Sequence, residues 1–253
     1  MRESSVYIPT VREHEPLKFS YRVPQGPEGE VVELTAAEME QLLLKRLESA
    51  TENPAQAMWE LAQFYKTGDR LERASEVFHE LLGSVDDLEI KAQIIFSLGQ
   101  TAEKSNDFEL AVRFYREALG MEPCSPFTWY FIHNNLGYSL NRLGRFVEGE
   151  RVCRQAIAIS TQPPNAHKNL GLALVGQGRD REAAESFIAA TQADAADPRS
   201  LRHLEALLTE HPELEFDFAG ALDACRKAVA VAGEAVERAG AQWTAAARQK
   251  KQA

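Results

Sequence analysis

The chain has 253 residues, of which 44% are hydrophobic and 26% charged, and this composition is typical of a folded globular protein rather than a disordered one. Its formal net charge of −10 argues against sequence-independent binding to nucleic acid or to an anionic membrane surface. The amino-terminal stretch lacks the apolar run of a secretory signal, and no stretch approaches the roughly 20 apolar residues of a membrane helix, so we expect a soluble, cytoplasmic protein.

Residues 1–34 differ in pattern from the rest of the chain. Phe19, Tyr21 and Val23 alternate with polar residues, the pattern breaks at Pro-Gln-Gly-Pro (24–27), and apolar residues resume at Val31. This pattern predicts an extended segment or a β-hairpin. A two-stranded hairpin alone is marginally stable in water, so the segment either docks on the helices, pairs with a partner or stays a loose tail.

Residues 35–51 have the pattern of a capping helix. Thr35 and Glu38 form a Thr-x-x-Glu capping box, which is a signature of a helix start. The apolar residues that follow recur at helical spacing on one face and are Met39, Leu42, Leu43 and Leu47. We expect this helix to cover the apolar end of the segment that follows.

A repeat begins after this helix. A leucine followed by a small residue recurs at steps of 37, 38 and 34 residues, in the pairs Leu61-Ala62, Leu98-Gly99, Leu136-Gly137 and Leu170-Gly171. Twelve residues after each small residue comes another small one, at Ala74, Ala111, Gly149 and Ala183. Four residues further stand Phe78, Tyr115, Cys153 and Phe187. A fixed period of this length indicates a repeat architecture.

The spacing inside each repeat indicates a helical hairpin. Two amphipathic helices that pack antiparallel need small side chains where their axes approach, and a large one nearby to fill the remaining space. Polar or glycine turns at Asn106, Gly144 and Gly178 separate the two helices. The pattern predicts four hairpins, over residues 55–88, 92–125, 130–163 and 164–197.

Residues 198–253 predict a degenerate fifth unit and a capping helix. Leu204 stands in the leucine position, but Pro212 ends the helix and the small residues that should follow are out of register. An alanine-rich helix follows from about Phe216 to Gln249, and Leu222, Val229 and Val236, seven apart, form an apolar stripe on it.

The repeat resembles the tetratricopeptide repeat. The second unit matches its pattern at Leu98, Gly99, Ala111, Tyr115, Ala118 and Pro123. The resemblance implies an all-α fold over residues 35–253, a right-handed superhelical α-solenoid of helix-turn-helix repeats with helical caps, preceded by the short extended or hairpin segment. The favoured tryptophan of the family is replaced by Met58, Ile95, His133 and His167.

In such a solenoid the first helices of successive units line a concave groove, where function is expected. Helical spacing and the resemblance give a candidate peptide-binding set, which is Phe96, Gln100, Asn134, Asn135, Tyr138, Lys168, Asn169, Arg199, Arg202 and His203. Packing does not explain Asn135 and Asn169, so we expect their amides to face the groove and hold peptide main chain. This arrangement is similar to the asparagine ladders of the family. The competing interpretation is that any exposed helix face is polar.

Basic residues accompany these asparagines. Lys168, Arg199 and Arg202, with Arg142, predict a positive patch suited to an acidic segment or a C-terminal carboxylate. The carboxylate clamp of the family requires lysine and asparagine in the first unit, where Trp59 and Gln63 stand instead, so a standard chaperone-tail clamp is not expected.

No catalytic motif is present, and we expect neither an enzyme nor a cofactor. His133 and His167 occupy equivalent positions in adjacent units, but equivalent helices lie at least about 8 to 10 Å apart, too far for both to bind one zinc ion. They therefore predict structural histidines and no metal site. The three cysteines, Cys124, Cys153 and Cys225, include no Cys-x-x-Cys pair and are expected to be small buried hydrophobic residues.

Three functions remain open from the sequence. The first is a noncatalytic adaptor or scaffold that binds an extended peptide segment of a partner protein in its groove. The second is a chaperone or assembly factor that holds hydrophobic segments through groove aromatics. The third is a structural subunit that self-associates through its outer face or terminal helix. Salt should weaken the first kind of binding and leave the second nearly unchanged.

Overall fold

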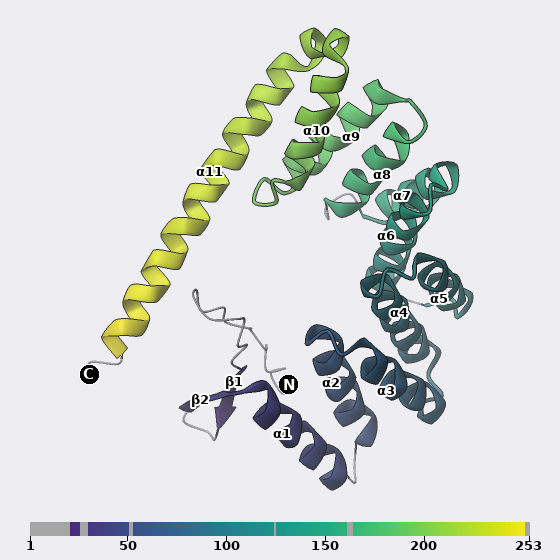
Figure 1. The fold of residues 1–253 in the computed structure, drawn as a ribbon, viewed down its shortest axis with the longest axis vertical. Helices are drawn as coiled ribbons and strands as arrows, with labels where there is room; N and C mark the ends of the chain where they lie inside the picture. The colour runs from purple at the N-terminus through teal and green to yellow at the C-terminus, as the bar shows by residue number, and fades with distance from the viewer. Residues whose placement is uncertain (1–20, 26–29, 51–52, 124, 161–163, 251–253) are drawn as a thin grey trace. The chain divides into compact units, whose positions relative to one another are not determined.

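The computed structural model describes residues 21–25, 30–50, 53–123, 125–160 and 164–250. The chain divides into two compact units, Met1–Asp86 and Asp87–Ala253. Both consist of antiparallel helices, and the first also carries one strand pair (Figure 1). The predicted all-α repeat fold with a short β-hairpin is confirmed.

Unit 1 begins with an antiparallel pair formed by β1 (Tyr21–Gln25) and β2 (Glu30–Leu34), in which Val23 lies opposite Val32. β1 runs through Pro24, where the sequence predicted a break. Each strand of a two-stranded sheet is an edge strand, so the missing N–H of a proline is tolerated there. The prediction for Phe19 lies outside the described residues.

The rest of unit 1 is helical, with α1 (Ala36–Ser49), α2 (Pro54–Thr67) and α3 (Leu71–Ser84). The predicted capping box of α1 is present: the Thr35 N–H donates to Glu38 Oε2 at 2.8 Å, and the Glu38 N–H donates to Thr35 Oγ1 at 3.3 Å. α1 packs against α2 and buries Met39 and Leu43.

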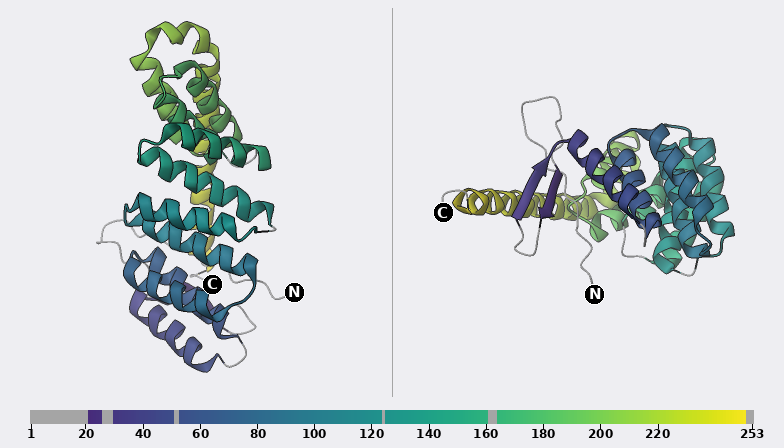
Figure 2. Two further views of the ribbon diagram at one scale, coloured as in Figure 1. Left: turned by 90° about the vertical axis from the view of Figure 1, so that its right-hand side faces the viewer. Right: turned by 90° about the horizontal axis from the view of Figure 1, so that it is seen from below.

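Unit 2 contains the remaining helices, which are α4 (Leu88–Lys104), α5 (Phe108–Gly120), α6 (Pro126–Arg142), α7 (Phe146–Ile159), α8 (Asn165–Val175), α9 (Asp180–Ala193), α10 (Arg199–Glu210) and α11 (Pro212–Lys250). They form hairpins that follow one another in chain order (Figures 1 and 2). α5, α7 and α9 each contact the first helix of the next hairpin as well as their own partner. The core of unit 2 is therefore continuous from hairpin to hairpin.

The repeated glycines mark where paired helices approach most closely. A Cβ atom added at Gly99 would lie 2.4 Å from the ring of Tyr115, and one added at Gly137 would lie 2.4 Å from Sγ of Cys153. A Cβ atom added at Gly171 would clash with the ring of Phe187 in the same way. The repeat spacing therefore reflects packing between the helices of one hairpin, as the sequence predicts.

The turns inside the hairpins follow the sequence as well. Asn106, Gly144 and Gly178 have φ angles of 60°, 72° and 69°. This left-handed conformation is the one that glycine and asparagine adopt most readily after a helix. Each of the three ends the first helix of its hairpin at the predicted place.

α11 begins earlier than the sequence indicates. We predicted a start near Phe216, whereas the helix begins at Pro212. Pro212 thus has two effects: α10 ends before it, and its fixed φ angle suits the first turn of the next helix.

Two of the three cysteines are buried, as predicted, and the third, Cys124, lies outside the described residues. Cys153 and Cys225 are both reduced. Burial raises the pKa of the Cys153 thiol to about 12, so it is protonated and unreactive at neutral pH.

Candidate functional site: the first helices of unit 2

The four first helices of the hairpins in unit 2, α4, α6, α8 and α10, carry all the candidate binding residues. α6 contacts both α4 and α8 directly. We call the side of the unit formed by these four helices the inner face. Within it, the candidate residues fall into one group that is held in packing and another that is not.

Asn169 belongs to the first group, and the prediction that packing does not require it is wrong. Its side chain is only 3% exposed, and its Nδ2 donates to Asn134 Oδ1 at 3.0 Å and to the Asn134 carbonyl at 3.3 Å. Asn141 Nδ2 in turn donates to the Asn169 carbonyl at 2.8 Å. These amides join α6 to α8, because a buried side-chain amide can satisfy a main-chain carbonyl of a neighbouring helix.

Asn134 is likewise buried, at 6% exposure, and its Nδ2 donates to Asn135 Oδ1 at 2.9 Å. Asn135 is half-buried, and it also hydrogen-bonds Tyr115 of α5. Of the two asparagines predicted to hold peptide main chain, Asn135 alone retains partial exposure to solvent.

A buried polar cluster lies next to Asn135, between α4, α5 and α6. Glu103 accepts hydrogen bonds from the Tyr115 hydroxyl at 2.8 Å and from Ser139 Oγ at 3.3 Å. Burial raises the pKa of Glu103, and these hydrogen bonds and the charge of Arg142 oppose the shift in part. Burial and the charge of Glu103 raise the pKa of Tyr115 well above its usual value.

Tyr138 and Arg142 stabilise each other on the same helix. Arg142 Nη1 donates to the Tyr138 hydroxyl at 2.9 Å, and its guanidinium lies 4.4 Å from the centre of the Phe108 ring. Tyr138 meets Phe108 edge-on at 6.1 Å. Arg142, which the sequence placed in the positive patch, is thus stacked on α5.

Phe96 and Gln100 of α4 are both half-buried. The Phe96 ring lies 5.7 Å from that of the fully buried Tyr115, and Gln100 also interacts with other parts of the protein. The aromatic residues at this end of the inner face therefore contribute to packing.

The second group comes from α8 and α10, and we call Lys168, Arg199, Arg202 and His203 the basic cluster. Lys168 Nζ donates to the neutral Asn165 Oδ1 at 2.9 Å. Burial, and next the charge of Arg199, lower the pKa of Lys168. The two helices therefore bring like charges close together.

Arg199 has an acidic partner of its own. Its Nε lies 2.8 Å from Asp197 Oδ1, and its Nη2 lies 2.5 Å from Asp197 Oδ2. This paired geometry lowers the pKa of Asp197 to about 2. Arg202 is exposed, and no acid among the described residues forms an ion pair with it or with Lys168.

His203 completes the cluster. Its ring stacks on Phe187 with the ring centres 5.4 Å apart. Burial, then the charges of Lys168, Arg202 and Arg199, lower its pKa, so the imidazole is neutral at neutral pH. The net charge of the cluster together with Asp197 is +3 − 1 = +2, in a chain whose formal net charge is −10.

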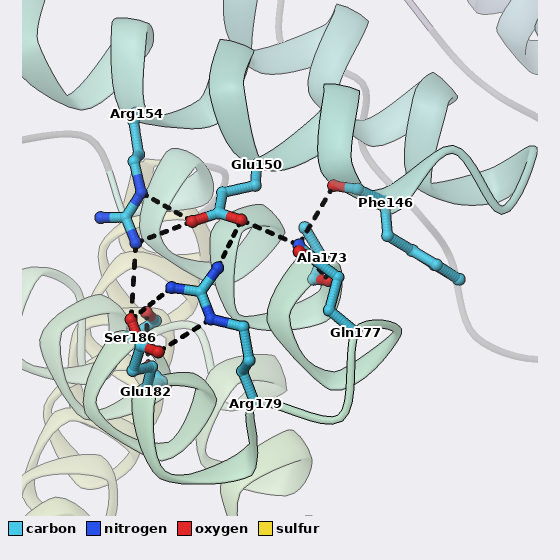
Figure 3. A network of polar contacts seen from close by, with 8 residues as sticks. All are labelled: Phe146, Glu150, Arg154, Ala173, Gln177, Arg179, Glu182 and Ser186. Carbon is cyan, nitrogen blue, oxygen red and sulfur yellow. Dashed lines mark hydrogen bonds and ion pairs between the residues drawn. The ribbon is translucent and has the colours of Figure 1, made fainter.

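Arg154 and Arg179 of unit 2, unlike the basic cluster, are paired with acids. Figure 3 shows Glu150 of α7 accepting from Arg154 Nε at 2.9 Å and from Arg179 Nη1 at 2.6 Å. Arg179 Nε also donates to Glu182 Oε1 at 2.8 Å. This network links successive hairpins and leaves little positive charge for a ligand.

One exposed feature of α6 was not predicted from the sequence. Phe127 is 72% exposed, and its ring lies 4.4 Å from that of Phe131. Phe131 in turn packs against a small cluster that includes Ala166 of α8. The i, i+4 spacing of the two phenylalanines was the available signal.

His133 has the contacts of a packing residue. Its Nδ1 lies 2.8 Å from the Trp129 carbonyl oxygen and its ring stacks on the Trp129 ring, while burial lowers its pKa. Burial also lowers the pKa of His167. Among the described residues, no helix is long and apolar enough to cross a membrane.

Comparison with known families decides the identity of the repeat. A profile described as "Tetratricopeptide repeat" matches residues 92–123, which span most of α4 and all of α5. The chain therefore contains a tetratricopeptide repeat. Human tetratricopeptide repeat protein 7B is 30% identical over 105 residues, which are 42% of this chain and 12% of that protein. The chain thus spans about an eighth of the length of this curated relative.

Solved structures show the same fold. BtubC from P. vanneervenii matches with a TM-score of 0.62 and 15% identity, over 80% of this chain and 89% of that one. YrrB, described as a tetratricopeptide protein with an unusual peptide-binding site, matches with a TM-score of 0.54 and 17% identity, over 78% of this chain and 99% of that one. Tetratricopeptide folds are suited to protein–protein interaction, and such proteins are generally noncatalytic scaffolds.

Proposed function

We propose that this tetratricopeptide protein is a noncatalytic adaptor or scaffold that binds an extended segment of a partner protein on the inner face of unit 2. The observation that carries the proposal is the basic cluster. Lys168 and Arg202 come from successive first helices, 34 residues apart, and neither forms an ion pair with an acid among the described residues. A negative group of the partner is the missing complement.

A carboxylate suits this position. Lys168 is half-buried, so an anion that reaches it leaves part of its own water shell and gains a stronger interaction than it would at an exposed lysine. Arg202 offers a planar set of donors that matches both oxygens of a carboxylate. Arg199, whose charge is neutralised in part by Asp197, adds to the positive electrostatic potential at this position. The proposed ligand is therefore an acidic side chain or the C-terminal carboxylate of a peptide.

Further contacts come from the rest of the inner face. Asn135 and Gln100 are half-buried amides at the α4 and α6 end of the face. The exposed Phe127, beside the half-buried Phe131, offers an apolar surface on α6, next to α8. Asn134 and Asn169, both buried, are assigned here to positioning α6 against α8 instead of to ligand contact.

The test compares two variants that remove the same charge. Affinity capture with the wild-type chain identifies a partner segment, and its labelled peptide is titrated by fluorescence anisotropy. We expect Lys168→Ala with Arg202→Ala to weaken binding at least tenfold, since each lost charge-assisted hydrogen bond contributes about 1.5 to 3 kcal/mol. The control, Arg113→Ala with Lys227→Ala, removes exposed cations of α5 and α11 and should bind normally. Equal affinity of both variants would refute the proposal.

The exposed Phe127 favours one alternative, a chaperone that holds hydrophobic segments. Salt separates the two functions, because binding to the basic cluster weakens as ionic strength rises and apolar holding does not. If Phe127→Ser abolishes capture and salt leaves the affinity unchanged, the chaperone function is correct and the adaptor function is wrong.

A further inference from the structure

Charged side chains link the second helices of successive hairpins in unit 2. Arg116 of α5 donates from Nη2 to Glu148 Oε2 of α7 at 2.9 Å, and 49% and 40% of the two side chains are exposed. Glu148 also accepts a hydrogen bond at 2.8 Å from Nε of Arg145, which is the N-cap residue of α7. One carboxylate thus joins the preceding second helix to the start of its own helix.

The same arrangement recurs one hairpin later. Arg154 of α7 lies 3.7 Å from Glu182 of α9. Glu182 also accepts a hydrogen bond at 2.8 Å from Nε of Arg179, the N-cap residue of α9 (Figure 3). These three residues follow their counterparts in the first arrangement by 38, 34 and 34 residues. We call the two sets together the ion-pair ladder, which consists of Arg116, Arg145, Glu148, Arg154, Arg179 and Glu182.

The sequence confines the ion-pair ladder to α5, α7 and α9. In the step from α3 to α5, His79 and Leu110 stand at the repeat positions of Arg116 and Glu148, and leucine carries no charge. In the step from α9 to α11, Ile188 stands where the ladder requires an arginine. The ladder therefore joins the second helices of the three hairpins that begin with α4, α6 and α8.

The first helices of these hairpins are joined differently. α6 contacts α4 and α8 directly, and the buried amides of Asn141 and Asn169 connect α6 to α8. Among the described residues, α5 and α7 make no comparably extensive backbone contact with each other, and neither do α7 and α9. Long charged side chains thus connect the second helices, whereas close packing and uncharged groups connect the first helices.

We propose that the ion-pair ladder sets the angle between successive hairpins and weakens as ionic strength rises. Exposed ion pairs are individually weak and are screened by salt, because the Debye length falls from about 10 Å at 0.1 M to about 3 Å at 1 M. The buried amides and the apolar cores of the hairpins are screened much less. High salt therefore moves α5, α7 and α9 apart while the hairpins stay folded.

This movement changes the shape of the inner face. In a stack of repeats, curvature follows from the small rotation between neighbouring repeats. Because the first helices stay in contact, a wider second-helix side makes the inner face more concave. The inference goes beyond the proposed function, since it concerns the shape of this face whatever ligand binds there.

The direction of the movement distinguishes it from a general effect of charge. The chain has a formal net charge of −10, so screening of its overall repulsion brings its parts closer together. Screening of the ion-pair ladder removes an attraction and has the opposite effect on the second helices. An increase in their separation with salt is therefore specific to the ladder.

The experiment measures the distance between spin labels on α5 and α9 of the full chain by double electron–electron resonance. The label sites, Arg113→Cys and Glu185→Cys, are exposed, lie outside the ladder and occupy equivalent repeat positions. Cys153 and Cys225 are buried, and Cys124 is replaced by serine. We expect the mean distance between the labels to increase between about 0.05 and 1 M salt. An unchanged or shorter distance overturns the proposal.

A labelled variant without the carboxylates of the ladder connects this change to named residues. Glu148→Gln with Glu182→Gln should give the longer distance already at low salt and should lose the response to salt, because an amide carries no charge. The control, Glu117→Gln with Glu210→Gln, removes the same charge from exposed acids of α5 and α10 and should respond as the wild type does. Circular dichroism verifies that each variant keeps its helix content. A normal salt response in the ladder variant, or a lost response in the control, overturns the proposal.

Discussion

The two ends of the inner face use equivalent repeat positions in opposite ways. On α4 and α6, Asn134, Arg142 and Glu103 have protein partners that satisfy their polar groups. On α8 and α10, Lys168 and Arg202 form no ion pair with an acid among the described residues. The position of a residue within the repeat decides which way its side chain points. The neighbouring hairpin decides whether that side chain has a protein partner. The predictions below test this difference.

The largest expected effect is on stability at the packed end. Asn169→Ala removes the hydrogen bonds that join α8 to α6 and leaves buried groups of Asn134 unpaired, so we expect a loss of about 1 to 3 kcal/mol in the free energy of unfolding. Urea denaturation monitored by circular dichroism measures it. Asn135→Ala, at the equivalent repeat position but half-buried, should cost less than about 1 kcal/mol. A cost for Asn169→Ala no greater than that of the control would contradict the packing role.

A smaller loss is expected when the stacked arginine is removed. Arg142→Ala eliminates the contact with Phe108 and the hydrogen bond to Tyr138, which together should stabilise the fold by about 0.5 to 1 kcal/mol at an exposed site. Lys168→Ala should stay within about 0.5 kcal/mol of the wild type. Thermal unfolding measures the stability of both variants. The prediction is wrong if Lys168→Ala is destabilised more than Arg142→Ala.

The buried carboxyl of Glu103 should appear in the pH dependence of stability. Its pKa is raised above 4.5 in the folded state, so its protonated form favours folding, and the stabilisation present at low pH is lost as pH rises through the folded pKa. Glu103→Gln removes this titration and still offers an acceptor to Tyr115. We therefore expect the stability of Glu103→Gln relative to wild type to increase between about pH 4 and pH 8. If the free energy of unfolding changes with pH in the same way in both proteins, the pKa of Glu103 is not raised.

The smallest expected effect concerns His203 and the ligand. A bound carboxylate opposes the charges of Lys168, Arg202 and Arg199 and joins Asp197 in favouring the protonated imidazole, so binding should raise the lowered pKa of His203. Affinity for the peptide should then increase as pH falls below 6.5, the ordinary histidine value. Anisotropy titrations across this range should show that the peptide affinity of His203→Gln depends less on pH than that of the wild type. An equally strong pH dependence in the variant would exclude His203 from the site.

The sequence predicted the features that depend on one hairpin. Gly99 recurs with Tyr115 because the two residues touch within a hairpin, and Asn106 and Gly144 mark turns through their own backbone conformation. The charges of Lys168 and Arg202 were also placed on one face by the 34-residue period.

The burial of Asn169 could not be predicted from the residue pattern of one hairpin. It depends on Asn134 and Asn141, which belong to the preceding hairpin, and on how closely α6 and α8 approach. The position equivalent to Asn169 in the preceding hairpin is held by Asn135, which is half-buried, so the repeat pattern alone does not distinguish the two. Stacking of Arg142 on Phe108 likewise depends on two helices whose side chains meet only in the folded unit.

The most direct test of the account is a charge reversal across the interface. Lys168→Glu with Arg202→Glu should abolish binding of the acidic partner peptide, and replacing the acidic residue of that peptide by lysine should restore it in the variant only, because the attraction is re-formed with its sign exchanged. Anisotropy titration of each protein with each peptide gives four affinities, from which the coupling energy between the basic cluster and the acidic residue of the peptide follows. Equal binding of both peptides by the wild type and the variant would show that the basic cluster does not contact the partner.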